Sequence, residues 1–226
     1  MSKKRKAISI EILADLETPL SVFKKLGNKP FSYLFESVEG GEKWARYSLI
    51  GLPSSTVLKV FKNEIQIWKK GKIEEKFMVD DPLKYIEDYQ ESIDIDISDD
   101  LPIFTGGLVG YLGYDCIKYI EPKLSKNDLP DPLGTPDALF MLSEEVAVFD
   151  NLNNKLHLIV LSKSDSQEDI SEAQEKLKSL SEKLLKPLVQ ENSQKVEQPV
   201  TEKDFISGFG EIEFKKTVEK IKEYIR

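Results

Sequence analysis

The chain has 226 residues, of which 40% are hydrophobic and 9% aromatic, so it can bury a core as one large domain or two small ones. Its 32 basic and 40 acidic residues give a formal net charge of −8, which argues against a nucleic acid or an anionic membrane surface as its main partner. A single cysteine, Cys116, and a single histidine, His157, exclude an intramolecular disulfide and a histidine-rich metal site.

The N-terminal run SKKRK at residues 2–6 is basic. A run of this length is typical of a solvated chain end, so we favour that interpretation over a targeting signal or a nucleic-acid patch. No apolar segment follows it as in a secretory signal, and no apolar run approaches the roughly 18 residues of a membrane span. We therefore expect a cytoplasmic protein.

The first predicted helix begins at Thr18-Pro19, a cap residue followed by proline, and ends at Gly27. Its expected apolar face consists of Leu20, Phe23 and Leu26. Strand patterns follow at 31–37, 46–51, 56–62, 64–68 and 73–78. Their close spacing predicts an antiparallel meander.

Asp81-Pro82 predicts the start of a second helix, and the acidic residues 92–103 after it indicate a surface loop. Further strands are expected at 105–114, 137–149 and 155–162, the last two joined by a turn at 150–154. Residues 166–189 predict a long helix that Pro187 kinks or ends. Its apolar stripe is Ile170, Ala173, Leu177, Leu180, Leu184 and Leu188.

The polar segment 190–199 shows no periodicity and is typical of a linker. A helical stripe returns from Glu213 onward, formed by Phe214, Val218, Ile221 and Ile225, and the sequence ends at Arg226 without a capping signal. We expect the natural polypeptide to continue. The whole pattern predicts an α+β fold, largely antiparallel sheets with a few flanking helices.

The stretch GGLVGYLGYD at 106–115 places glycines at 107, 110 and 113. It matches neither the dinucleotide fingerprint nor the phosphate-binding P-loop. Glycines in a strand allow another backbone or a ligand to approach closely. Structural packing is the favoured interpretation, and lining a ligand pocket is the alternative.

No catalytic constellation stands out in the sequence. His157 alternates with leucines on a predicted strand, which favours a structural or surface histidine over a general base. We interpret Cys116 as a small buried residue. We expect no catalytic residue in this chain.

The stretch FESVEGGEKWARYSLIG at 35–51 has the groups that a free amino acid requires. Glu36 could accept from an α-ammonium group, and Ser37, Arg46 and Ser48 could donate to an α-carboxylate. Phe35 and Tyr47 could wall a flat apolar side chain. The alternative is a hairpin in which Glu36 and Arg46 pair across strands, and the residues alone leave the two open.

The same stretch closely resembles the N-terminal signature of anthranilate synthase component I, a Leu-Leu-Glu-Ser element followed by Glu-Gly-Gly-Glu and Arg-Tyr-Ser-x-Ile-Gly. This sequence has Leu-Phe-Glu-Ser at 34–37, so phenylalanine replaces one leucine. The resemblance extends to 106–121, to 138–150 and to the last helix, which is most of the chain.

The resemblance implies that Ser37 belongs to an L-tryptophan feedback site, with Glu36, Phe35, Arg46, Tyr47 and Ser48 as weaker candidates. It implies a family that converts chorismate and an ammonia source to anthranilate and pyruvate, with Mg2+ in the full-length enzyme and a glutamine amidotransferase subunit (component II) as partner. The catalytic, chorismate-binding and metal residues are expected in a C-terminal domain beyond this chain, so this chain alone should bind no Mg2+ and should be inactive.

The resemblance divides the chain into an N-terminal regulatory domain at 1–189, a linker at 190–212 and the first helix of a truncated catalytic domain at 213–226. Residues 138–161 and the last helix are then expected to pack against sheets of the missing domain, leaving an exposed apolar patch. Two alternatives remain: the N-terminal part of aminodeoxychorismate synthase component I, and a free-standing amino-acid-binding or structural module.

Overall fold

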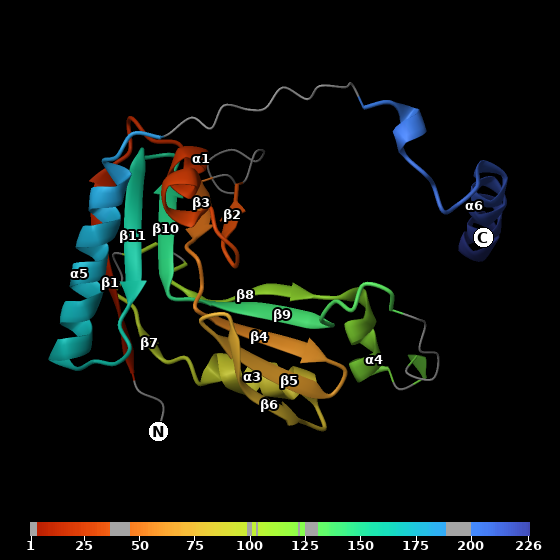
Figure 1. The fold of residues 1–226 in the computed structure, drawn as a ribbon, viewed down its shortest axis with the longest axis horizontal. Coiled ribbons are helices and arrows are strands. Elements are labelled where there is room, and N and C mark those ends of the chain that lie inside the picture. Colours follow the sequence, from red (N-terminus) through yellow and green to blue (C-terminus); the bar gives the residue numbers. More distant parts are fainter. Residues whose placement is uncertain are drawn as a thin grey trace. The chain divides into compact units, whose positions relative to one another are not determined.

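The computed structural model describes residues 4–36, 46–98, 101–102, 104–121, 123–124, 131–188 and 200–226. Contacts along the chain define two units, Met1–Leu188 and Val189–Arg226. The first unit contains two β-sheets with helices on their faces (Figure 1). The predicted α+β class with antiparallel sheets is therefore confirmed, whereas the predicted division into three parts stays a prediction.

The first sheet has six strands in the order β2-β3-β10-β11-β1-β7. Their bounds are β1 (Arg5–Leu13), β2 (Tyr33–Phe35), β3 (Tyr47–Gly51), β7 (Ile95–Asp96), β10 (Glu145–Asp150) and β11 (Lys155–Leu161). Apart from the parallel β1–β7 pair, neighbours run antiparallel. Helix α5 (Gln167–Leu184) covers one face with α1 (Pro19–Val22) and η1 (Phe23–Gly27), as Figure 1 shows, and buries the main core there.

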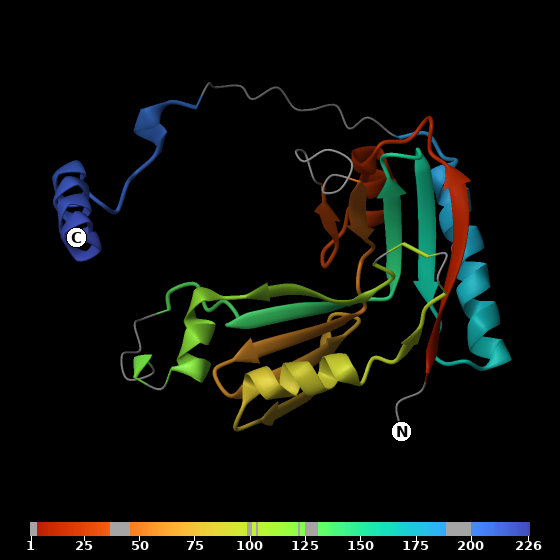
Figure 2. The same ribbon diagram turned by 180° about the vertical axis from the view of Figure 1, so that it is seen from behind.

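The second sheet has five antiparallel strands in the order β6-β5-β4-β9-β8. They are β4 (Thr56–Phe61), β5 (Glu64–Lys69), β6 (Lys72–Met78), β8 (Gly107–Leu112) and β9 (Ala138–Ser143). Figure 2 shows α3 (Pro82–Glu91) lying on one face of this sheet. The short helices η2 (Tyr114–Cys116) and α4 (Ile117–Ile120) follow β8.

The helix starts are where their capping residues predict them. The Thr18 hydroxyl accepts from the Ser21 backbone N–H, Asp81 caps α3, and the Ser166 hydroxyl accepts from the Asp169 N–H. Helix α5 ends at Leu184, before Pro187. The first helix differs from its predicted face, because Leu20 is 51% exposed and Val22 is buried instead.

The predicted single meander is wrong, because its strands divide between the two sheets. Strands β2 and β3 belong to the first sheet, and β4, β5 and β6 to the second. The strand expected at 137–149 divides in the same way, with Glu144 between β9 and β10. One continuous segment thereby links the two sheets, and the Arg5 guanidinium donates to Glu144 at this bend, 2.6 Å away.

The predicted solvated N-terminus is wrong from residue 5 onward. Arg5–Leu13 forms β1, which pairs with β11 over seven residues and with β7 on its other edge. Strand β7 also interrupts the predicted loop at 92–103. The ammonium of Lys4 lies 3.1 Å from the Asp96 carboxylate. The basic run is thus partly structural, because its charges pair at the sheet edge.

Residues 138–161 were expected to pack on another domain, but they form the interior of both sheets. Strand β9 lies between β4 and β8, and β10 lies between β3 and β11. Most side chains of β10 and β11 are buried within the first unit. Packing of this segment against another domain stays a prediction.

The second unit contains η4 (Glu202–Asp204) and α6 (Glu211–Ile225). The predicted stripe of α6 is exposed in this unit. The polar segment 190–199, predicted as a linker, lies outside the described residues. In the part of the chain that the structure describes, no helix is both long and apolar enough to cross a bilayer.

Candidate ligand site at the ends of strands β2 and β3

The predicted amino-acid site falls at one end of the β2–β3 pair. Phe35 is opposite Leu49 in this antiparallel register, so Glu36 follows the last paired residue of β2. Residues 37–45, which include the predicted inhibitor-site residue Ser37, lie outside the described residues. The described part of the candidate site is therefore Phe35, Glu36 and the residues around the start of β3.

The two strands place their predicted site residues on opposite faces. Phe35 and Tyr47 share one face through their common register with Leu49, because alternate residues of a strand face the same side. Ser48 points to the other face, is 2% exposed, and accepts a hydrogen bond from the Asn151 side-chain amide at 3.1 Å. The structure therefore places Phe35 and Tyr47 on one face and Ser48 on the other.

The aromatic face carries an exposed apolar surface. The rings of Tyr33 and Phe35 lie 5.0 Å apart between centroids, and Phe35 is 53% exposed. Tyr47 packs on the buried cluster of Val146, Val148 and Ile159. A flat apolar group could pack on the free side of Phe35, since offset and tilted ring contacts are favourable.

Arg46 pairs with Asp150 of β10, and the described residues show no ion pair between Arg46 and Glu36. Its Nη2 atom lies 2.7 Å from Asp150 Oδ2, and its Nε donates to both carboxylate oxygens at 3.2 Å. The guanidinium carbon also lies 4.8 Å from the centroid of the Tyr47 ring. The alternative in which Arg46 pairs with Glu36 across a hairpin is thus not what the structure shows, because the guanidinium is bound to the Asp150 carboxylate.

Asp150 is a buried acceptor that organises this end of the sheet. Besides Arg46 it accepts from the backbone N–H groups of Leu152 and Asn153 and from the Asn153 amide. Burial, the largest single influence, raises the pKa of Asp150, but the donors from Arg46 and Asn153 together outweigh it and lower this pKa to about 2. Sequence reasoning missed Asp150 as a site residue, although it begins the turn sequence DNLNN, in which aspartate typically accepts from following N–H groups.

Tyr33 connects the two sheets beside this site. Its hydroxyl and that of Ser143, at the end of β9, lie 2.8 Å apart and are buried. Burial raises the pKa of Tyr33 to about 12, although the hydrogen bond with Ser143 opposes the shift. A Cβ atom on Gly51, the cross-strand partner of Tyr33, would lie 1.8 Å from that ring, so glycine is required for the ring to lie across β3.

We expect Tyr33→Phe to lower the free energy of unfolding by about 1–2 kcal/mol, because it leaves the buried Ser143 hydroxyl without this partner. The matched control is Tyr111→Phe, since the exposed Tyr111 hydroxyl donates to the Pro136 carbonyl and its loss should cost under about 0.5 kcal/mol. Urea unfolding of both variants measures the difference. Equal effects would contradict a structural role for the link between the sheets.

The glycine-rich strand, His157 and Cys116 were the other candidates, and their surroundings indicate structural roles. A Cβ atom on Gly110 would lie 1.8 Å from the Leu139 carbonyl oxygen, which confirms the packing interpretation of the glycine-rich strand β8. His157 lies on β11 with its Nε2 atom 4.0 Å from Glu11. Cys116 is buried, its thiol donates to the Asp137 carbonyl, and burial and then Asp137 raise its pKa, which makes it a poor nucleophile.

Across the described ranges, no group of three His, Cys, Asp or Glu side chains could hold a metal ion.

Residues 36–226 match the family described as chorismate binding enzyme, and this match covers most of the chain. The chain belongs to this family. Within it, the chain is similar to anthranilate synthase component 1, which confirms the resemblance inferred from the sequence.

The anthranilate synthase component 1 of Pseudomonas putida is 43% identical over 219 residues, which are 96% of this chain and 44% of that protein. The protein of the same name from Acinetobacter calcoaceticus is 46% identical over 218 residues, 95% of this chain and 43% of that protein. The chain thus spans less than half the length of these curated relatives. A crystal structure of anthranilate synthase component I from Streptococcus pneumoniae TIGR4 has 25% identity and a TM-score of 0.49, covering 78% of this chain and 37% of that chain.

Proposed function

We propose that this chain is the tryptophan-sensing part of an anthranilate synthase component 1. The observation that carries the proposal is the exposed ring of Phe35 next to Glu36, at the end of β2, in a chain 43% identical to such a protein. An indole would pack on Phe35, and Glu36 would accept from the α-ammonium group.

The carboxylate of the ligand needs a hydrogen-bond donor other than Arg46 and Ser48. The Arg46 guanidinium is bound to Asp150, and the Ser48 hydroxyl is buried on the opposite face. We assign this role to Ser37. The Arg46–Asp150 pair instead fixes the start of β3, so that the two strand ends hold a constant spacing around the ligand.

For feedback control, tryptophan must bind two states of the enzyme with different affinity. We propose that chorismate conversion to anthranilate and pyruvate, Mg2+ and the amidotransferase component II belong to the longer cytoplasmic protein, since the relatives are more than twice as long as the matched region. Tryptophan bound at Phe35 and Ser37 would favour its inactive state.

Isothermal titration of L-tryptophan into the 226-residue chain tests the site. We expect saturable heat from the wild type, at least a tenfold loss of affinity in Ser37→Ala, and unchanged binding in Ser171→Ala, which alters an exposed serine of α5. Equal binding by the two variants would overturn the assignment of Ser37.

The regulatory consequence is tested in the full-length enzyme. Ser37→Phe should abolish inhibition of anthranilate formation by L-tryptophan while leaving turnover without the inhibitor near that of the wild type. Inhibition that persists in this variant would contradict the proposed sensing role, whatever the titration of the shorter chain shows.

A further inference from the structure

Lys59 lies in the middle of the second sheet, on the face opposite α3. On β4 its neighbours Leu58 and Val60 are buried in the cluster that packs against α3, so alternation directs Lys59 to the other face. Its cross-strand partners are Gln66 on β5 and Leu139 on β9. A cation thus occupies a central, half-buried position beside an apolar residue.

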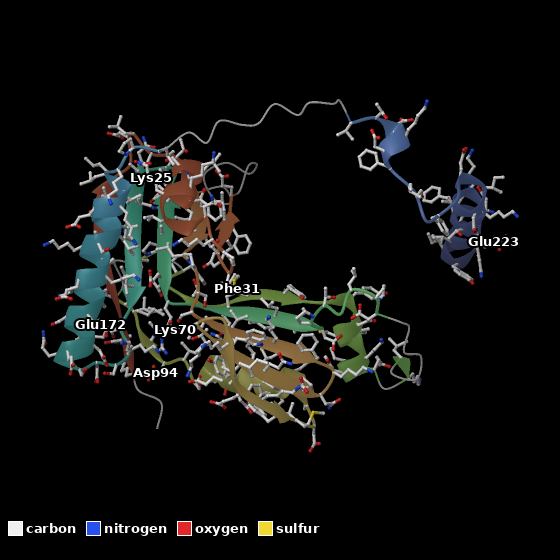
Figure 3. The ribbon with its side chains drawn as sticks, viewed as in Figure 1. Lys25, Phe31, Lys70, Asp94, Glu172 and Glu223 are labelled. Carbon is white, nitrogen blue, oxygen red and sulfur yellow. The ribbon has the colours of Figure 1, made fainter. Side chains whose placement is uncertain are left out.

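Two aromatic rings flank this cation. The Lys59 ammonium lies 3.9 Å from the centroid of the Trp68 ring and 5.8 Å from that of Phe31, both within the range of cation–π contact. Figure 3 shows Phe31 between β2 and the five-stranded sheet. The rings come from separate segments of the chain, so the fold assembles the arrangement.

Both rings are held in place. The Trp68 indole N–H donates to Gln66 at 3.0 Å, and Gln66 in turn donates to Glu64. Phe31 has a φ of 61°, an unfavourable backbone conformation for a bulky residue, and its carbonyl accepts from the Ser54 N–H. Strain of this kind persists where the surrounding structure imposes it, and it concentrates at ligand sites.

The described residues supply no carboxylate within 4.0 Å of Lys59, whereas Lys69, Lys76 and Lys155 on the same two sheets each lie beside a carboxylate. Cation–π contact engages the ring faces but leaves the N–H donors of the ammonium free to bind an acceptor. A carboxylate is the acceptor that gains most from a partly desolvated ammonium, and an apolar flat body would fit the flanking rings.

We propose that Lys59, Phe31 and Trp68 form a binding site for a small aromatic carboxylate. The carboxylate accepts from the Lys59 ammonium, and the ring of the ligand packs against Phe31 and Trp68. This site lies on the second sheet and is distinct from the tryptophan site proposed at Phe35 and Ser37 on the first.

Benzoate is the probe, and Trp68 is the reporter in a Trp44→Phe background, since the chain has two tryptophans. We expect saturable change of Trp68 fluorescence with benzoate, in the weak range of small ligands, and none with uncharged benzamide. Lys59→Met keeps the alkyl stem and should weaken benzoate binding at least tenfold, whereas Lys59→Arg should retain it within about threefold.

Ser37→Ala separates this site from the proposed function, because it should leave benzoate binding unchanged whether or not L-tryptophan binds elsewhere. Circular dichroism of Lys59→Met should match that of the wild type, which links the loss to the missing charge. Absence of a saturable response in the wild type, or equal benzoate affinity in Lys59→Met, would overturn the proposal.

Discussion

Gly110→Ala should lower the free energy of unfolding of the first unit by more than about 3 kcal/mol. The added Cβ atom would lie 1.8 Å from the Leu139 carbonyl oxygen and 2.7 Å from the Phe140 Cα atom. Both atoms belong to the backbone of β9, so relief requires β8 to move away from its only partner strand among the described residues. No rotation of a side chain can remove this clash.

Urea unfolding followed by far-ultraviolet circular dichroism measures the effect. Gly208→Ala is the matched control, because a Cβ atom there meets nothing within 4 Å, and it should change the free energy by less than about 0.5 kcal/mol. A Gly110→Ala chain as stable as Gly208→Ala would show that β8 does not pair closely with β9 in solution. The glycine-rich motif would then need an explanation other than packing.

The elements of the fold could be predicted from local patterns, because their causes are local. Thr18, Asp81 and Ser166 each cap a helix within three residues of themselves, and strand alternation needs a few neighbouring residues. The assignment of strands to sheets depends instead on contacts between distant residues, such as the hydrogen bond at the bend between β9 and β10 from Arg5 to Glu144, which are 139 residues apart. No periodic pattern in the sequence predicts that contact.

The difference between local patterns and contacts of distant residues also explains which features of the candidate site the sequence could predict. The sequence grouped Phe35, Tyr47 and Arg46 in one candidate site; in the structure the β2–β3 register places Phe35 and Tyr47 on one face, and Arg46 contacts the Tyr47 ring. The alternative that the sequence left open paired Arg46 with Glu36, which is near in sequence, whereas the structure pairs Arg46 with Asp150, which only the β3–β10 pairing brings close. Only a sheet order can show that the carboxylate of a distant turn is within reach.

Asp150→Asn is therefore expected to be the most destabilising polar substitution near the site, by about 2–3 kcal/mol at neutral pH. The asparagine amide would face the Arg46 guanidinium, donor against donor, and one of its two polar atoms could no longer accept from Leu152 or Asn153. Arg46→Met retains the stem and removes the cation. It should cost less, because the Arg46 side chain is 37% exposed and solvent screens its share of the pair.

The dependence on pH identifies the charge as the cause. The pKa of Asp150 falls from 3.8 to about 2 on folding, which corresponds to at most about 2 kcal/mol, reduced by solvent around Arg46. Since the folded pKa is the lower one, this stabilisation is complete above about pH 4 and is lost as the pH falls toward 2. The wild type should therefore lose stability over this interval, and Asp150→Asn should lose less by up to about 2 kcal/mol. If the free energies of unfolding of the two proteins changed in parallel with pH, Asp150 would stabilise the turn through its shape alone. The strand spacing assigned to the tryptophan site would then not depend on the ion pair between Asp150 and Arg46.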